Sequence, residues 1–325
     1  MGHYSTGAGY PVGGSAKIAR DILAIVESYG GRAATRAAVE QIVVEKGAAV
    51  GVIVKGKMIR ANKVLSAVGA YHTFVTLLPK ELAVLHPFLE KAREELMNET
   101  TGLKSSPSHA MTFLALKGTA EELQIPKANW WVNDDPRFPS VFISFTSAKD
   151  PSWATRHPNV SVCEIVVEAP HEMFEKWKSD PVKNRSPDYL KLKEELADSM
   201  CDILFKHFPQ LKDKVEFRDA STPLSAEHFL GSKKGCAYGL AATPKRYACE
   251  YLRPATPIKN LYLGAQDVVS CSIAGSAMGG IIAACAANFK TLFDFGQIIN
   301  TDRPATEAPD QWRMEDEVDA GGVIF

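Results

Sequence analysis

The chain has 325 residues, of which 46% are hydrophobic, and its formal net charge is −1. This length and apolar content predict a large core and two interleaved domains. A nearly neutral charge without a basic stripe excludes an electrostatic case for nucleic-acid binding. No run of eighteen apolar residues occurs, so no membrane-spanning helix is expected. The six cysteines form no CxxC pair and show no metal-site spacing, so no metal is expected.

Gly7–Gly14 is the first glycine-rich stretch. A phosphate-binding glycine turn follows a buried strand, but only six residues precede this stretch, and Pro11 lies inside it. We therefore expect a loop that opens an amphipathic helix at Ala16–Tyr29, where apolar residues recur at helical spacing. Gly30 and Gly31 are expected to end this helix.

Short segments with the residue types of β-strands follow the helix. They are Arg32–Thr35, Val39–Val44, Ala48–Val54, Lys57–Arg60 and Asn62–Ala67. The dipeptides Lys46-Gly47 and Lys55-Gly56 fit the turns between three of them.

The pattern changes at about Tyr71, and residues 71–250 predict a sheet-containing α+β lobe. The expected helices and strands are, in chain order, Glu81–Asn98, Ala110–Lys117, Val141–Thr146, Val160–Val167, His171–Lys178 and Pro187–His207. From Gly296 the sequence becomes polar and acidic, so we expect residues 296–325 to form a peripheral tail.

Asn260–Gly280 is the most informative segment of the chain. It reads as a strand at Asn260–Gly264, an acidic turn at Asp267 and a run of small residues that opens a helix. The first N–H groups of a helix are unpaired and carry partial positive charge, so such a strand-to-helix junction binds anions and dipoles. Asp267 is placed to accept hydrogen bonds from a polyol, and the small residues allow a flat ring to approach the backbone.

This segment, LYLGAQDVVSCSIAGSAMGG at Leu261–Gly280, also carries a resemblance to a known family. It resembles the C-terminal flavin-binding motif of the FAD-dependent desaturase, saturase and amine-oxidase superfamily. Within that superfamily the chain is most similar to the retinol saturase family. Further matching stretches are YPVGGSAKIA at Tyr10–Ala19, FTSAKDPSW at Phe145–Trp153, MFEKW at Met173–Trp177, FPQLKDKVE at Phe208–Glu216, STPLSAEHFL at Ser221–Leu230 and GCAYG at Gly235–Gly239.

The resemblance implies an α/β fold in which an incomplete FAD-binding lobe, Rossmann-like and of the amine-oxidase type, is interleaved with an α+β substrate lobe. Residues 1–70 and 251–295 are expected to form the FAD-binding lobe, and residues 71–250 the substrate lobe. The family also holds the FAD pyrophosphate in a strand–GxGxxG–helix unit, which this sequence lacks. The resemblance therefore implies a missing N-terminal FAD-binding segment, without which we expect the chain to bind FAD weakly or not at all.

FAD is the cofactor that the resemblance implies, with NAD(P)H as a candidate electron donor. The residues that it assigns to cofactor binding are Val39, Gly264, Asp267, Ala274, Gly275, Ser276, Ala277 and Gly279. Asp267 is expected to bind the ribityl hydroxyls, and the backbone of Val39 to contact the adenine. An ordinary strand position is the alternative interpretation of Val39.

No motif for hydrolytic or metal-dependent catalysis is present, which suits a flavoenzyme because the cofactor itself transfers the hydride. Tyr238 and His228 are the candidate proton donors or flavin-facing groups. The alternatives are a core tyrosine and a surface histidine. Six aromatic residues either line a tunnel for a long polyene or form ordinary core: Trp130, Trp131, Phe138, Phe142, Phe145 and Trp153.

The function that these expectations favour is FAD-dependent reduction of a C=C bond in a hydrophobic polyene or retinoid. Endoplasmic reticulum association with peripheral membrane contact follows from the same resemblance. Two alternatives stay open. One is a carotenoid or fatty-acid cis–trans isomerase of the same fold, and the other is a non-catalytic remnant or binding module.

Overall fold

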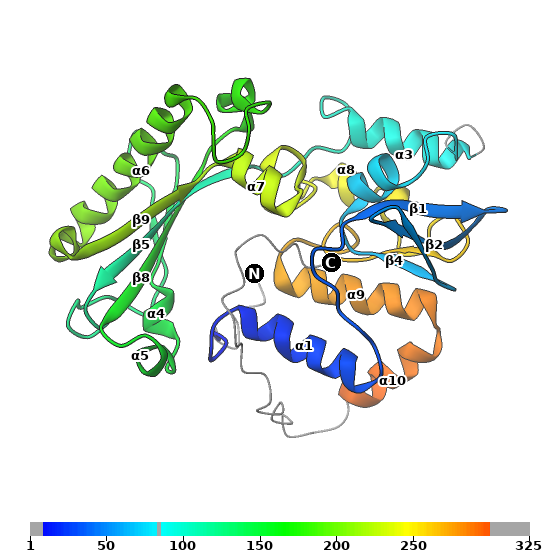
Figure 1. Ribbon diagram of the computed structural model, residues 1–325, viewed down its shortest axis with the longest axis horizontal. Helices are drawn as coiled ribbons and strands as arrows, with labels where there is room; N and C mark the ends of the chain where they lie inside the picture. Colours follow the sequence, from blue (N-terminus) through cyan, green and yellow to red (C-terminus); the bar gives the residue numbers. More distant parts are fainter. Residues whose placement is uncertain (1–8, 83–85, 300–325) are drawn as a thin grey trace. The chain divides into compact units, whose positions relative to one another are not determined.

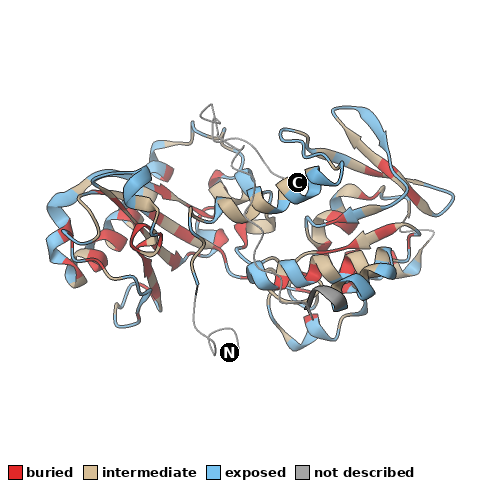
Figure 2. Ribbon diagram, turned by 90° about the horizontal axis from the view of Figure 1, so that it is seen from below, coloured by how far each residue is buried: buried red, intermediate tan, exposed pale blue. Residues whose placement is uncertain are grey.

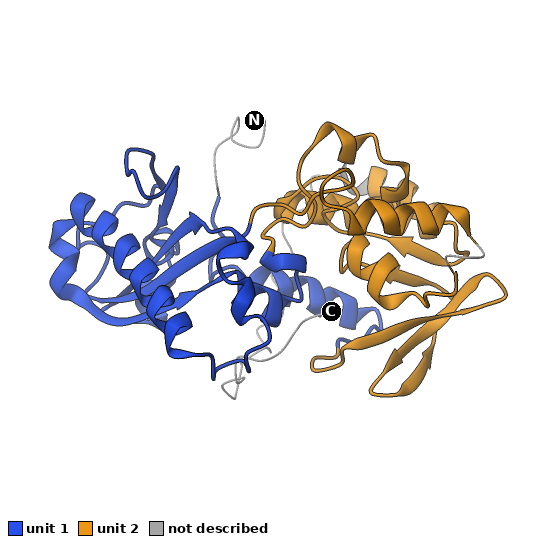
Figure 3. Cartoon of the chain, turned by 90° about the horizontal axis from the view of Figure 1, so that it is seen from above, with its two compact units in different colours: residues 1–33, 108–235 blue, residues 34–107, 236–325 orange. Residues whose placement is uncertain are grey.

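The computed structural model describes residues 9–82 and 86–299. The contacts of the chain divide it into two compact units (Figure 3). Unit 1 contains residues 9–33 and 108–235, and unit 2 contains the described residues of 34–107 and 236–299. Each unit is thus built from two separate segments of the chain. The sequence places the boundaries near residues 70 and 250 instead, and groups residues 1–33 with the other lobe.

Unit 1 contains a five-stranded antiparallel sheet with the order β6-β7-β8-β5-β9. The strands are β5 (His109–Lys117), β6 (Trp130–Val132), β7 (Val141–Ser144), β8 (Val160–Glu168) and β9 (Val215–Ser221). Buried and more exposed residues alternate along β5 and β8, which is typical of a sheet with one face on the core. The expected strands of this lobe are confirmed.

The described residues of unit 1 contain five α-helices. They are α1 (Ala16–Ser28), α4 (Thr146–Lys149), α5 (Trp153–Arg156), α6 (Pro187–His207) and α7 (Pro223–Leu230), and the unit also contains 3₁₀ turns. The long helix α6 lies across one face of the sheet, and its buried side chains join the core of this unit (Figure 1). Proline at its first position starts α6 without losing a backbone hydrogen bond. Helix α1 has no buried residue.

Asp150 anchors the N-terminal segment to unit 1. Its carboxylate accepts hydrogen bonds from the backbone N–H of Gly13 at 3.1 and 3.2 Å, from Ser152 and from the guanidinium of Arg156. Gly13 lies in the loop before α1, so this one carboxylate joins residues that are 137 positions apart.

Unit 2 contains two small sheets. The antiparallel sheet is formed by β1 (Val39–Glu45), β2 (Ala48–Val54) and β3 (Lys57–Arg60), and the parallel pair by β4 (Val64–Ser66) and β10 (Leu261–Leu263). The dipeptides Lys46-Gly47 and Lys55-Gly56 have positive φ angles at both residues, as two-residue hairpin turns require. The strand expected at Arg32–Thr35 is wrong, because these residues are irregular and pair with no strand.

The helices of unit 2 include a π-helix at His72–Leu77, α3 (Pro87–Met97), α8 (Pro244–Tyr247), α9 (Ser272–Ala287) and α10 (Lys290–Ile299). Buried residues lie in strands of both units, such as β5 and β8 of unit 1 and β10 of unit 2, whereas β3 is exposed along its whole length (Figure 2). Residues 296–299 belong to α10, and the rest of the expected tail lies outside the described residues.

Arg93 of α3 is buried and closes the C-terminal end of the π-helix. Its guanidinium donates hydrogen bonds to the carbonyl oxygens of Phe74, Leu78, Pro79 and Lys80 at 2.7 to 3.0 Å. Carbonyl groups at the end of a helix need donors from outside the helix, and Arg93 supplies them. Pro79 O also accepts a hydrogen bond from the backbone N–H of Leu82. The guanidinium of Arg93 thus supplies hydrogen-bond donors that a further turn of the helix would otherwise provide.

The anchor at Asp150 makes the stability of the protein depend on pH. Burial by itself would raise the pKa of Asp150, but hydrogen bonds from Gly13, Ser152 and Arg156 lower it to about 2. An unfolded aspartate has a pKa of about 3.9. The stabilisation is therefore complete well above pH 4 and disappears as the pH falls from about 4 to about 2. We expect Asp150→Asn to lower the urea midpoint at pH 7 much more than at pH 2.5. Equal losses at both pH values would contradict this role.

Candidate functional site

The parallel strands β4 and β10 end at the same edge of their sheet, where Leu263 lies opposite Ser66. In α/β folds, ligands bind in the loops that follow the carboxyl ends of parallel strands. Here those loops are residues 67–70 after β4 and residues 264–270 after β10. The Asp267 turn that the sequence singled out is therefore at the expected edge.

Asp267 connects three segments of unit 2. Its Oδ2 accepts a hydrogen bond from the backbone N–H of Ala70 at 2.8 Å, and its Oδ1 accepts one from Leu240 at 3.1 Å. The residue is only 4% exposed. The carboxylate thus holds the loop after β4 and the segment around Leu240 against the loop after β10.

Two glycines make this close approach possible. A Cβ atom on Gly69 would lie 2.9 Å from Oδ2 of Asp267, and one on Gly239 would lie 2.5 Å from Oδ1. Both glycines also have positive φ angles, 89° and 63°, which other residues rarely adopt. The two positions therefore form a cradle around the carboxylate that any side chain would fill.

Arg246 completes the cluster from α8, and sequence reasoning missed it. Its guanidinium donates to the carbonyl oxygens of Leu240 and Gln266, on either side of the bonds that Asp267 makes. Arg246 is 2% exposed, and its Nε–H has no partner among the described residues. Together with Asp267 and Ile282, it lines a cavity of about 270 Å³. A buried arginine bonded only to carbonyls leaves no signature in the sequence.

The small residues of α9 divide between two sides of the helix. Gly275 and Gly279 are buried, and added Cβ atoms would lie 1.9 Å from Ser270 O and 2.1 Å from Ala265 O. These glycines therefore let α9 pack on its own preceding loop. Ala274 and Ala277 are exposed, and Ser276 is half-buried. Flavin contact by these five residues stays a prediction.

The two other residues that were predicted to bind the cofactor, Gly264 and Val39, lie outside α9. Gly264 is buried against Leu65 and Ala283, and Val39 is half-buried opposite Val54 at the start of β1. Both belong to unit 2, like Asp267.

The two candidate proton donors lie in different units. Tyr238 is 47% exposed in unit 2, and its backbone N–H donates to Ser106 Oγ at 2.9 Å. His228 is exposed on α7 of unit 1.

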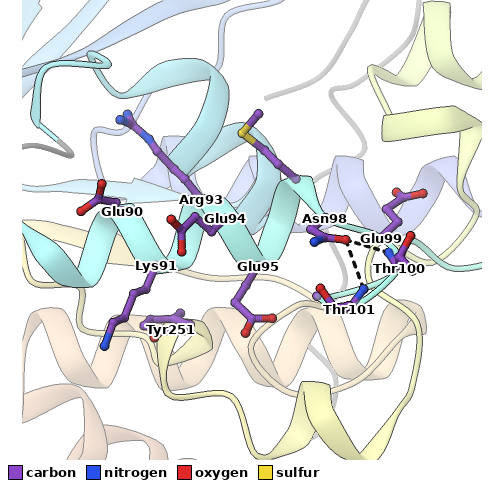
Figure 4. Close-up of a pocket in the computed structure, with 12 residues that line it drawn as sticks. Glu90, Lys91, Arg93, Glu94, Glu95, Asn98, Glu99, Thr100, Thr101 and Tyr251 are labelled. Atoms are coloured by element: carbon purple, nitrogen blue, oxygen red, sulfur yellow. Dashed lines mark hydrogen bonds between the residues drawn. The ribbon is translucent and has the colours of Figure 1, made fainter.

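A broader cavity of about 1050 Å³ lies along α3 of unit 2 and is separate from the Asp267 cluster (Figure 4). Four glutamates line it: Glu90, Glu94, Glu95 and Glu99. Glu95 forms an ion pair with Lys245 at 2.6 Å.

Nowhere in residues 9–82 and 86–299 do three or more acidic, histidine or cysteine side chains form a metal-binding group. In the same ranges, no helix is long and apolar enough to cross a membrane.

Comparison with known proteins gives relatives that include a reductase and an isomerase. No family model matches the chain. It is 33% identical over 308 residues to an all-trans-retinol 13,14-reductase of Danio rerio, which covers 86% of this chain and 49% of that protein. It is 27% identical over 248 residues to the chloroplastic prolycopene isomerase of Daucus carota, which covers 73% of this chain and 36% of that protein.

Among solved structures, an oxidoreductase from Methanosarcina mazei aligns with a TM-score of 0.55 and 18% identity, covering 83% of this chain and 53% of that one. The chain spans about half the length, or less, of the curated relatives named above. These similarities confirm the expected resemblance to the retinol saturase family and the expected mixed α/β fold.

Two neighbouring glycines of α9 test the packing of this helix. Gly279→Ala places a Cβ atom against Ala265 O, and we expect a loss of roughly 1–3 kcal/mol in the free energy of unfolding. The matched control is Gly280→Ala, because nothing lies within 4 Å of a Cβ atom at Gly280. Removing a helical glycine there is expected to stabilise the protein by up to about 1 kcal/mol. Urea unfolding of both variants measures the difference, and equal effects would show that α9 does not rest on its loop.

Proposed function

We propose that this chain acts in the FAD-dependent reduction of one C=C bond of a conjugated polyene alcohol. The proposal starts from the similarity to an all-trans-retinol 13,14-reductase, which extends over 86% of this chain. The relative's name supplies the substrate class. The structure supports the proposal through the position of the Asp267 cluster, which consists of Asp267, Gly69, Gly239 and Arg246. This cluster lies at the carboxyl edge of the parallel strands β4 and β10, where ligands bind in α/β folds.

The residues of the cluster fit FAD. A carboxylate has about four acceptor positions, and backbone N–H groups occupy two of those of Asp267. The remaining positions suit the hydroxyls of a ribityl chain. The N-terminal residue of α9 is preceded by Cys271, which makes no capping hydrogen bond, so the first N–H groups of this helix suit the electron-rich edge of the flavin ring.

When bound, reduced FAD supplies the hydride that adds to one carbon of the double bond. The protein has to orient the polyene, exclude water and deliver a proton to the neighbouring carbon. We assign the proton delivery to the hydroxyl of Tyr238, which is half-exposed in the segment next to Gly239. NAD(P)H is the electron donor in this proposal.

Isomerisation is the second candidate function, and the similarity to a prolycopene isomerase supports it. The two reactions differ in electron balance. A reductase consumes one equivalent of reduced flavin for each product, whereas an isomerase returns the flavin unchanged. Anaerobic titration of the reduced protein with all-trans-retinol therefore separates them.

Peripheral contact with the endoplasmic reticulum membrane belongs to the same proposal. Phe289, just before α10, and Leu292 and Phe293 near the start of this helix are exposed apolar residues, which supports such a contact. Phe293→Ser is expected to reduce cosedimentation with phosphatidylcholine vesicles. Unchanged cosedimentation would remove α10 from the membrane contact.

Asp267→Ala and Tyr238→Phe test the two assigned roles. Asp267→Ala is expected to weaken FAD binding by roughly ten- to a hundred-fold, because it removes a charged acceptor from a closed site. Tyr238→Phe is expected to keep FAD binding and to slow single-turnover oxidation of reduced flavin by all-trans-retinol by about a hundred-fold. Flavin fluorescence measures the first effect and stopped-flow absorbance the second. Unchanged FAD binding in the Asp267 variant would refute the site. A parent protein that binds no FAD would favour the non-catalytic alternative.

A further inference from the structure

The sheet of unit 1 has a second face that α6 does not cover. Residues that lie directly opposite each other in neighbouring antiparallel strands point to the same face. The register places Trp131 opposite Phe142, Phe142 opposite Val166, and Val166 opposite Met111. These four apolar residues therefore form a row across β6, β7, β8 and β5, which we call the apolar row. Strands are about 4.8 Å apart, so the row is roughly 14 Å long.

The apolar row is open to solvent at one end. Trp131 is 64% exposed, and its ring lies 5.0 Å from that of Phe142. The preceding residue points the other way, as alternation along a strand requires. Trp130 packs edge-on against Phe208 at the end of α6. The aromatic cluster expected from the sequence is therefore divided between the core and the open face.

A polar group lies beside the apolar row on the same face. The next row of the sheet contains Ser144 opposite Glu164, and Glu164 opposite Phe113. Lys149 of α4 donates hydrogen bonds from Nζ to Ser144 Oγ at 2.7 Å and to Asn129 Oδ1. An ammonium group has three donors, so among the described residues these two acceptors leave one N–H of Lys149 available.

Lys149 and Glu164 are poorly solvated for charged groups. Burial lowers the pKa of Lys149 and raises the pKa of Glu164, and the attraction between the two charges opposes both shifts. A purely apolar partner that covered this face would desolvate both charges and return no hydrogen bond. A partner with an apolar body and one hydroxyl would cover the apolar row and also satisfy the free N–H of Lys149.

We propose that this face of unit 1 binds a polyene alcohol, with the polyene along the apolar row and the terminal hydroxyl between Lys149 and Glu164. The identity of the ligand rests on the proposed function, but its binding requires neither flavin nor electrons. Lys149 donates to the hydroxyl oxygen, and Glu164 accepts the hydroxyl proton. Trp131 forms the outer end of the surface and sets the length of polyene that can be covered.

The test is retinol binding to the purified chain without flavin, followed by the quenching of tryptophan fluorescence. A conjugated polyene absorbs where tryptophan emits, so bound all-trans-retinol quenches a nearby indole. Trp131→Ala is expected to weaken retinol binding about ten-fold through the loss of an aromatic contact surface. The matched control is Trp130→Phe, a change in the same strand on the opposite face, which is expected to leave the affinity unchanged.

The polar contact is tested with two ligands. Lys149→Met is expected to weaken binding of all-trans-retinol about ten-fold or more, because a hydrogen bond from a charged donor is lost. The same variant is expected to bind a polyene hydrocarbon of similar length, which has no oxygen to accept this hydrogen bond, as the parent does. Lys191→Met on the exposed side of α6 serves as the control lysine. A general structural defect in the Lys149 variant would weaken both ligands equally, and circular dichroism checks its fold.

The outcomes separate this proposal from the proposed function. Equal retinol affinity in the parent, Trp131→Ala and Lys149→Met proteins would overturn the binding face, even if the protein reduces retinol. Equal losses in the Trp130 and Trp131 variants would overturn it as well. Binding with the expected pattern but without any reduction would keep the face and refute the reductase.

Discussion

The buried carboxylate of Asp267 is the interaction on which the architecture of unit 2 depends. Its partners are the backbone N–H groups of Ala70 and Leu240. Charged acceptors make hydrogen bonds about twice as strong as neutral ones, but an unpaired charge in a low-dielectric interior is costly. The three loops must therefore meet at this point, or the charge loses its solvation. Because the partners are main-chain groups, the carboxylate specifies backbone positions rather than a particular set of neighbouring side chains.

Arg246 binds the same residue, Leu240, through the next peptide group. The N–H of Leu240 binds Asp267 and its carbonyl binds Arg246, so both polar groups of that residue are fixed. Gly239, next to it, has the positive φ angle and the absence of a side chain that this geometry needs. A negative and a positive buried group thus fix one short segment, and this preorganised segment is the wall that the proposed flavin would meet. Preorganised polar groups are effective in catalysis because they do not have to rearrange during the reaction.

The sequence predicts those features whose cause is local. The glycine turns between β1, β2 and β3, the strand at Leu261–Leu263 and the helices α1 and α6 all follow from turn chemistry and hydrophobic spacing. Arg93 and Arg246 could not be found in this way, because the carbonyls that they bind come together only in the fold. The glycines of α9 indicate that some other group comes close to the helix backbone, but the sequence does not say which group. Small size was read as room for a ring, whereas the structure shows contact with Ser270 O and Ala265 O.

The parallel pairing of β4 with β10 has a consequence for biosynthesis. Val64 lies opposite Leu261, so 197 residues (261 − 64) must be added before β4 meets its partner strand. At about 5–20 residues per second, the ribosome leaves this strand edge unpaired for roughly 10–40 s. An unpaired edge is a template for wrong pairing with other chains. The pairing that completes the parallel sheet of unit 2 therefore forms late in synthesis, and the edge of β4 is open to wrong pairing until β10 has emerged.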